Sequence, residues 1–128
     1  LVKLNRIMYT PMLVRLRKEL YKKQGLILFN AALIAESKMT YLSNNFVVLV
    51  TADKETQKKR LQDRNLSSEQ INTRLESQYT SEQKKRKIKE KIESSGQGKI
   101  WTLDNSHSDA SLKKVFDSII NTLEVKTE

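Results

Sequence analysis

The sequence predicts an α/β fold built on a parallel sheet. Residues 26–29 and 46–50 form unbroken apolar runs, and a third short strand is predicted at residues 99–103 after a glycine-containing break. Continuous rather than alternating hydrophobicity is typical of strands that are covered on both faces, as in parallel sheets. Helical segments separate these runs, and strand–helix–strand order favours parallel pairing through right-handed crossovers.

The first segment, residues 2–23, is predicted to be helical. Leucines recur in it at spacings of three and four, and basic residues occupy the other faces. We expect Pro11 to divide this helix, because an interior proline removes a backbone donor and clashes with the preceding turn. The apolar positions of the segment are Leu13, Leu16 and Leu20.

A long polar stretch between the second and third strands predicts three further helices. The first covers residues 54–64, the second starts at a cap formed by Ser67 or Ser68, and the third covers residues 81–93. Each has few apolar side chains, so we expect these helices to project from the sheet and to move. The apolar positions of the second and third helices are Ile71, Leu75, Tyr79, Ile88 and Ile92.

The last helix has a different pattern from the helices before it. Its apolar residues recur at helical spacing and predict a broad buried face. The tail from residue 125 to residue 128 is expected to fray. The apolar positions are Leu112, Val115, Phe116, Ile119, Ile120 and Leu123.

Composition narrows the possible classes of protein. The chain has 128 residues, one domain's worth or a large part of one, and its 38% hydrophobic content is enough for a core. The absence of cysteine excludes disulfides and thiolate metal sites, and a single His107 excludes a multi-histidine metal site. No apolar run is long enough for a bilayer and no secretory leader is visible, so we expect a cytoplasmic protein. The initial Leu1 fits a truncated reading frame or a trimmed chain.

The net charge of +9 indicates anionic partners, such as phosphorylated metabolites, nucleic acid or a membrane surface. The positive charge is unevenly distributed. Residues 1–23 contain seven Lys or Arg and one acidic residue, and residues 53–93 contain twelve and eight. The excess therefore lies in two helical segments and spares the predicted strands.

Several short motifs occur in a particular order along the chain. The run TQKKRLQDRN at residues 56–65 is followed by Ser68-Glu69-Gln70, Arg74 and Gln78. Leu4-Asn5-Arg6-Ile7 and Leu33-Ile34-Ala35-Glu36 lie upstream, and Leu103-Asp104-Asn105-Ser106 lies downstream. In order and spacing these motifs resemble those of dephospho-CoA kinases, over residues 4–123. The chain departs from the family pattern at Tyr9-Thr10-Pro11, at Ala31-Ala32 and at His107.

The resemblance implies an incomplete three-layer P-loop kinase fold, with a parallel sheet that lacks its first strand and a projecting helical lid. It also implies four regions. These are an acceptor (CoA-binding) helical region at 1–25, core strands and a connecting helix at 26–52, the lid at 53–95, and the last core strand with the C-terminal helix at 96–128.

Arginines on a mobile lid suit phosphoryl transfer, because guanidinium groups spread charge off the phosphoryl oxygens. Arg60 and Arg64 are four residues apart and share one face of the predicted helix. Spacing alone favours a solvated face paired with Asp63 or Glu55 for these two arginines, and Gln78 could be a helix cap. By resemblance, the lid residues that contact phosphate are Arg60, Arg64, Arg74 and Gln78.

The resemblance assigns two further groups of residues. Asn105 and Ser106 are expected in a loop beside adenine, although an ordinary strand-end turn is the alternative. Pro11 and Glu36 are expected on the acceptor side. No residue is assigned to a metal ion, and the catalytic group is unknown and expected upstream of Leu1.

The phosphate-binding motif Gly-x-x-x-x-Gly-Lys-Ser/Thr is missing, since the chain has only three glycines. By resemblance this loop, and with it the site for ATP and Mg²⁺, lies upstream of Leu1. The missing first strand would lie between residues 26–29 and 46–50. We therefore expect the isolated chain to be inactive, marginally folded or prone to self-association through its exposed sheet edges.

The implied activity is ATP-dependent phosphorylation of the ribose 3′-hydroxyl of dephospho-CoA, the last step of coenzyme A biosynthesis. Two alternatives stay open: another P-loop metabolite or nucleoside kinase, and a basic nucleic-acid-binding module. The nucleic-acid alternative is the less favoured, because the few aromatic residues are not interleaved with the basic runs. No membrane partner is expected.

Overall fold

The computed structural model describes residues 2–107 and 109–123. The chain divides into two units, one formed by residues up to Asn30 and one that begins at Ala31. No helix in the described ranges has both the length and the apolar character needed to cross a membrane. The predicted frayed tail at residues 125–128 lies outside the described residues.

The first unit contains one long helix, α1 (Val2–Leu20), with Pro11 inside it. The prediction that Pro11 divides this helix is wrong. A proline removes one backbone hydrogen bond, and a helix can accommodate that loss by bending rather than ending. After α1 the chain turns at Lys22, which adopts a left-handed conformation with a φ of 60°.

Residues 26–30, which follow that turn, belong to no helix or strand. The predicted strand at residues 26–29 is therefore absent, and its apolar side chains are exposed. A strand exists only where its backbone groups pair with those of a neighbour. The expected neighbour was a first strand upstream of Leu1, and no strand in the described part of the chain pairs with this segment.

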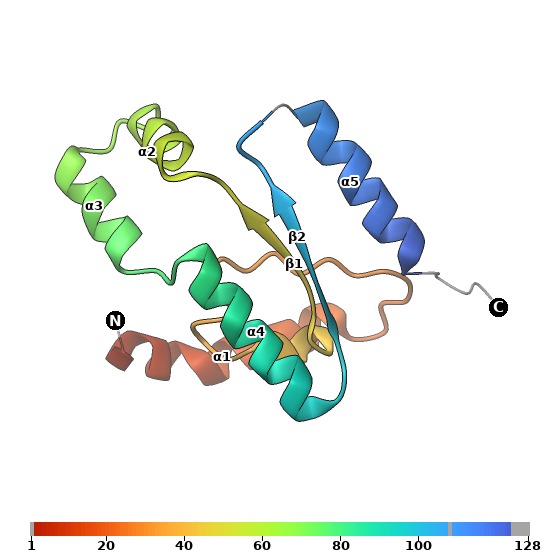
Figure 1. Ribbon diagram of the computed structural model, residues 1–128. Helices are drawn as coiled ribbons and strands as arrows, with labels where there is room; N and C mark the ends of the chain where they lie inside the picture. The colour runs from red at the N-terminus through yellow and green to blue at the C-terminus, as the bar shows by residue number, and fades with distance from the viewer. Residues whose placement is uncertain (1, 108, 124–128) are drawn as a thin grey trace. The chain divides into compact units, whose positions relative to one another are not determined.

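The second unit is organised around two strands, β1 (Phe46–Thr51) and β2 (Lys99–Asp104). They are adjacent and parallel, as Figure 1 shows. Val47 lies opposite Ile100 in the register, and Val50 lies opposite Leu103. The predicted α/β class and parallel pairing are confirmed, in a sheet of two strands instead of three.

Helix α4 (Ser81–Ser95) packs against one face of this sheet. Its Ile88 is only 1% exposed and joins Ala35 and Val47 in the core cluster, with Ile92 packed beside them. The expectation that this helix projects from the sheet is wrong. A narrow apolar stripe suffices here because a short residue such as Ala35 lets the helix approach closely, and one buried isoleucine contributes roughly 1.5–3 kcal/mol.

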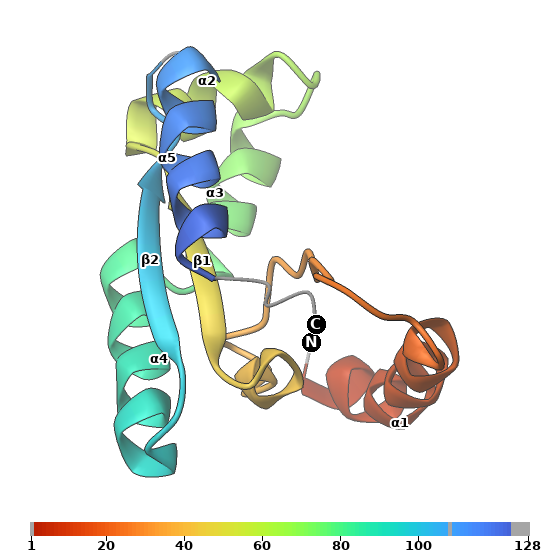
Figure 2. The ribbon, with the colours of Figure 1, turned by 90° about the vertical axis from the view of Figure 1, so that its right-hand side faces the viewer.

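Helix α5 (Asp109–Thr122) covers the opposite face of the sheet (Figure 2). Ile119 on this helix and Leu103 on β2 are buried, but Val115 is 45% exposed. The predicted broad buried face is therefore only partly buried. Two strands are roughly 5 Å apart, whereas a helix with its side chains is roughly 10 Å wide, so the helix overhangs the sheet.

In the sequence between β1 and β2, α2 (Lys54–Gln62) and α3 (Ser68–Glu76) pack against each other, and Ile71 of α3 is buried. We call residues 53–78 the arm. Ser67 caps α3 through its hydroxyl, as predicted, and Gln70 completes a capping box.

The short helix η1 (Thr40–Ser43) leads to a buried polar group at the amino end of the sheet. The Thr40 hydroxyl donates to Asn45 Oδ1 at 2.8 Å, and Asn45 Nδ2 donates to the Ser95 hydroxyl at 3.0 Å. Gly98 has a φ of +119°, and a Cβ there would lie 2.5 Å from the carbonyl oxygen of Asn45. We call Thr40, Asn45, Ser95 and Gly98 the Asn45 hub, which joins the starts of both strands.

Candidate functional site

A cleft of about 1040 Å³ opens at the carboxyl end of β1. Its walls come from the end of β1, the arm and the first turn of α4, all within the second unit. In open α/β sheets, ligands bind outside the carboxyl ends of the strands. This end of the sheet is therefore the first place to look for a site.

The four residues predicted to belong to the lid all line this cleft. Arg60 lies in the last turn of α2, and Arg64 follows in the turn that reverses the chain. Asn65 permits this reversal by adopting a left-handed conformation with a φ of 59°. Arg74 approaches from the last turn of α3 and Gln78 from the connection that follows. The structure brings them together, and their contact with phosphate remains a prediction.

Arg60 is held at the carboxyl end of β2. Its Nη2 donates a 2.8 Å hydrogen bond to the carbonyl oxygen of Asn105. The alternative pairing with Asp63 or Glu55 does not occur in the described part of the chain. Arg60 therefore bridges the arm to the loop after β2.

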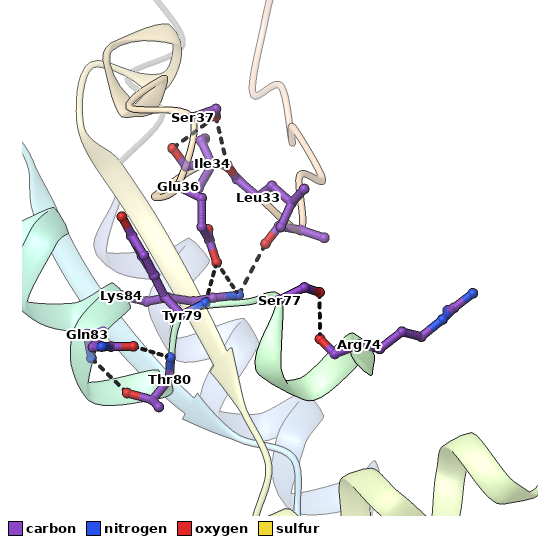
Figure 3. A network of polar contacts seen from close by, with 11 residues as sticks. Leu33, Ile34, Glu36, Ser37, Arg74, Ser77, Tyr79, Thr80, Gln83 and Lys84 are labelled. Atoms are coloured by element: carbon purple, nitrogen blue, oxygen red, sulfur yellow. Dashed lines mark hydrogen bonds and ion pairs between the residues drawn. The ribbon is translucent and has the colours of Figure 1, made fainter. Parts of the chain in front are cut away.

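Arg64 and Arg74 are exposed, and their guanidinium groups form no hydrogen bond or ion pair within residues 2–107 and 109–123. Figure 3 shows the Arg74 side chain extended away from the neighbouring polar contacts, while its carbonyl accepts a 2.9 Å hydrogen bond from the Ser77 hydroxyl. A free guanidinium presents a planar fork of donors that matches carboxylate and phosphate oxygens. The two arginines thus make one wall of the cleft attractive to anions.

Asp53, which begins the arm, also lines the cleft. Its carboxylate accepts hydrogen bonds from the Thr56 N–H at 2.7 Å and the Thr56 hydroxyl at 2.9 Å, and so caps α2. These bonds, the one from the Thr56 backbone first, lower the pKa of Asp53 below its ordinary value of 3.8. The carboxylate therefore stays ionised at neutral pH and holds the start of the arm.

Ser106 connects Asp53 to the end of β2. The Asp53 N–H donates to the Ser106 hydroxyl at 2.9 Å, and that hydroxyl donates to Asp104 Oδ1 at 2.6 Å. The hydrogen bonds from the Ser106 hydroxyl and N–H lower the pKa of Asp104. Asn105 lines the cleft and Ser106 does not. Both residues form a turn that ties β2 to the arm, and their position beside adenine remains a prediction.

The two residues predicted for the acceptor side do not line this cleft. Pro11 lies within α1, in the other unit. Glu36 accepts a hydrogen bond from the Tyr79 N–H and pairs with Lys84. Their contact with an acceptor remains a prediction. Lys84, which lines the cleft, was missed because the basic run around it resembles an ordinary solvated helix face.

The fit of a divalent metal ion can be judged from the available carboxylates. Among the described residues, no three His, Cys, Asp or Glu side chains are grouped so that they could hold a metal ion. The cleft is lined by arginines and amides that suit phosphate, and its described carboxylates are not grouped as a ligand set for Mg²⁺.

The comparison with protein families identifies the chain. The family model described as dephospho-CoA kinase matches residues 1–99. The chain belongs to the dephospho-CoA kinase family. Membership implies that the chain comes from a kinase, and that this kinase uses the small-molecule substrates of the family, ATP and dephospho-CoA. No curated protein and no solved structure matches the chain. The matched residues include β1, the arm and α4, and they end before Asn105 and Ser106.

Proposed function

We propose that this chain provides the lid and acceptor-side elements of a dephospho-CoA kinase. The complete enzyme transfers the γ-phosphoryl group of ATP to the ribose 3′-hydroxyl of dephospho-CoA, giving coenzyme A and ADP. The observation that carries this proposal is the cleft at the carboxyl end of β1, where Arg64 and Arg74 have no partner among the described residues, in a chain that belongs to this family.

The proposed role of the arginines follows from the chemistry of the reaction. The 3′-oxygen attacks the γ-phosphorus, the bond to the β–γ bridging oxygen breaks, and negative charge spreads over the transferred group. Arg64 lies in the turn between α2 and α3, and Arg74 lies in the last turn of α3, so they can approach that group from two directions. A base must accept the proton of the 3′-hydroxyl, and we place that base upstream of Leu1.

The phosphate-binding loop is also expected outside this chain. The only glycines are Gly25, Gly96 and Gly98, so no Gly-x-x-x-x-Gly-Lys-Ser/Thr motif is present. We propose that this loop, together with the Mg²⁺ that the family uses with ATP, belongs to a segment before Leu1. We also propose that the enzyme acts in the cytoplasm.

Without that segment, we expect the chain to be inactive and to associate with itself. In the described part of the chain β1 pairs only with β2, so its other edge carries unpaired backbone groups. Sedimentation velocity should show species larger than a monomer at high protein concentration. A monomer at every concentration would contradict this part of the proposal.

The activity is tested with two polypeptides. One is this chain alone, and the other is this chain joined at Leu1 to an N-terminal segment of a dephospho-CoA kinase that contains the phosphate-binding loop. Coenzyme A formed from ATP and dephospho-CoA is measured for both. We expect turnover by the joined protein and none by the chain alone. Robust turnover by the chain alone would show that the expected inactivity is wrong.

Two further outcomes would overturn the assignment of substrate. A joined protein that phosphorylates nucleoside monophosphates but not dephospho-CoA would favour another P-loop kinase. Tight binding of the chain to random duplex DNA at physiological salt, with a steep dependence on salt, would favour a nucleic-acid-binding module.

A further inference from the structure

A lysine–glutamate pair lies where the arm joins α4. Glu36 Oε1 is 3.5 Å from Lys84 Nζ and accepts a 3.0 Å hydrogen bond from the Tyr79 N–H (Figure 3). Lys84 Nζ also donates to the carbonyl oxygen of Ala32 at 3.2 Å. The carboxylate of Glu36 therefore contacts both Tyr79, which precedes the Thr80 cap, and Lys84 in the first turn of α4.

Glu36 itself is held firmly by its surroundings. Its neighbour Ala35 belongs to the core cluster, and the Ser37 hydroxyl donates to the carbonyl oxygen of Leu33 at 2.7 Å. The side chains of Glu36 and Lys84 are 15% and 17% exposed. The second carboxylate oxygen of Glu36 is buried and has no hydrogen-bond partner. Its charge is therefore compensated mainly by Lys84, and the loss of Lys84 would leave it unbalanced.

The connection after α3 is short. α3 ends at Glu76, and α4 begins after its cap at Thr80. The N–H of Tyr79, in this connection, is held by Glu36. Arg74 lies in the last turn of α3, a few residues before Tyr79. The orientation of α3 relative to Tyr79 therefore sets the position of Arg74.

We propose that Glu36 and Lys84 are positioning residues that set the direction of the arm and so place Arg74 in the cleft. This inference rests on the proposed function. It assigns Glu36 the role of positioning the arm by its contacts with Tyr79 and Lys84, and not a direct contact with dephospho-CoA. The pair acts at the α4 end of the arm, while Asp53 and Ser106 hold its other end.

The same helix supplies a matched control. Lys87 and Glu90 form an ion pair with the same 3.5 Å separation, but their side chains are 47% and 53% exposed. Exposed pairs of this kind contribute little to stability. K87M and E90A therefore repeat the chemical changes of K84M and E36A at a site that does not touch the arm.

The first experiment is amide hydrogen exchange on this chain as it stands. We expect E36A and K84M to speed exchange of the Tyr79 amide and of the amides at residues 63–78 by about fivefold or more. The reason is that local unfolding of this part of the arm, which exposes the amides to solvent, costs less free energy in the variants. Exchange in β1 should not change, and K87M and E90A should have no effect. Unchanged exchange at Tyr79, or an equal increase in β1, would overturn the proposal.

The second experiment measures kinetics in the joined protein. We expect E36Q and K84M to lower kcat by roughly tenfold to a hundredfold, since a misplacement of about 1 Å can have such an effect. The KM for dephospho-CoA should change by less than about threefold, and K84R should restore most of the activity. A raised KM with normal kcat would indicate direct substrate contact by Glu36 and overturn the proposal. If the joined protein has no activity at all, the proposed function fails, whereas the exchange experiment still decides the positioning role.

Discussion

The two ends of the sheet use polar side chains in opposite ways. At the amino end, the Asn45 hub buries Thr40 and Asn45 and pairs their polar atoms with one another and with Ser95. At the carboxyl end, Arg64 and Arg74 are exposed and have no partner within the described ranges. Satisfied polar groups contribute to stability, while unpaired cations remain available to a ligand. The polar side chains at the amino end of the sheet therefore stabilise the fold, whereas those at the carboxyl end remain available to bind a ligand.

The strongest test of this difference between the two ends of the sheet is to remove the arginines Arg64 and Arg74. In the joined protein we expect R64A or R74A to lower the rate of phosphoryl transfer by about a thousandfold, equivalent to about 4 kcal/mol, because such arginines stabilise charge in the transition state. The unfolding free energy should change by no more than about 0.5 kcal/mol, since neither side chain has a partner to lose among the residues that the structure describes. Steady-state kinetics and urea unfolding measure the two effects.

A matched substitution separates the cleft from general surface charge. R86A removes an exposed arginine on α4 that forms a 3.8 Å ion pair with Glu90 and does not line the cleft. We expect its kinetics to match those of the unmodified protein. If R64A, R74A and R86A lower the rate of phosphoryl transfer equally, the positive charge that lines the cleft has no special role in the reaction.

The amino end should respond in stability instead. We expect G98A to destabilise the fold by about 3 kcal/mol, because the added Cβ would meet the Asn45 carbonyl at 2.5 Å and φ is +119°. G96A is the control: Gly96 has a φ of +68° and open space around it, so its cost should be about 1 kcal/mol. Urea unfolding of both variants measures the difference, and equal effects would show that the contact with Asn45 is unimportant.

A smaller loss is expected from the hydroxyl within the hub. T40V removes the 2.8 Å hydrogen bond to Asn45 Oδ1, and this should cost about 1–2 kcal/mol because the acceptor is left buried. T73V makes the same change on α3, where the exposed hydroxyl donates to the carbonyl oxygen of Glu69. Its effect should stay within about 0.5 kcal/mol. A T40V variant as stable as T73V would mean that the hub adds little to stability.

The smallest expected effect is a pH dependence at the carboxyl end. The hydrogen bonds of Asp53 lower its pKa, so their stabilisation is complete above the ordinary value of 3.8 and is lost as pH falls through the lowered value. D53N keeps the cap but cannot titrate. We therefore expect the thermal midpoint to fall less between about pH 5 and pH 2 in D53N than in the unmodified chain. D63N, at the exposed end of α2, is the control, and a D53N curve that follows D63N would contradict this prediction.

The elements that could be predicted are those set by local pattern. β1 and β2 were predicted from short apolar runs, and Ser67 was one of the two serines predicted as a cap from their place before an amphipathic segment. The predicted family is confirmed by the match over residues 1–99. The gathering of Arg64 and Arg74 at one cleft follows the motif order that suggested the family.

The features that could not be predicted depend on partners distant in sequence. Residues 26–29 have the same apolar character as β1, but they have no strand to pair with. Ile88 and Ile92 form only a narrow apolar stripe in the sequence, and contact with Ala35 and Val47 is what places Ile88 in the core. Asn45 bonds to Ser95, fifty residues away, which no periodicity reveals.

The two capping boxes have a consequence for how the arm can vary in length. α3 begins with Ser67 and Gln70, and α4 begins with Thr80 and Gln83, so each helix start is specified by four consecutive residues. Such starts need no help from the sheet. An insertion or deletion between Gln70 and Thr80 would leave both helix starts intact, so the length of α3 can change without loss of either boundary.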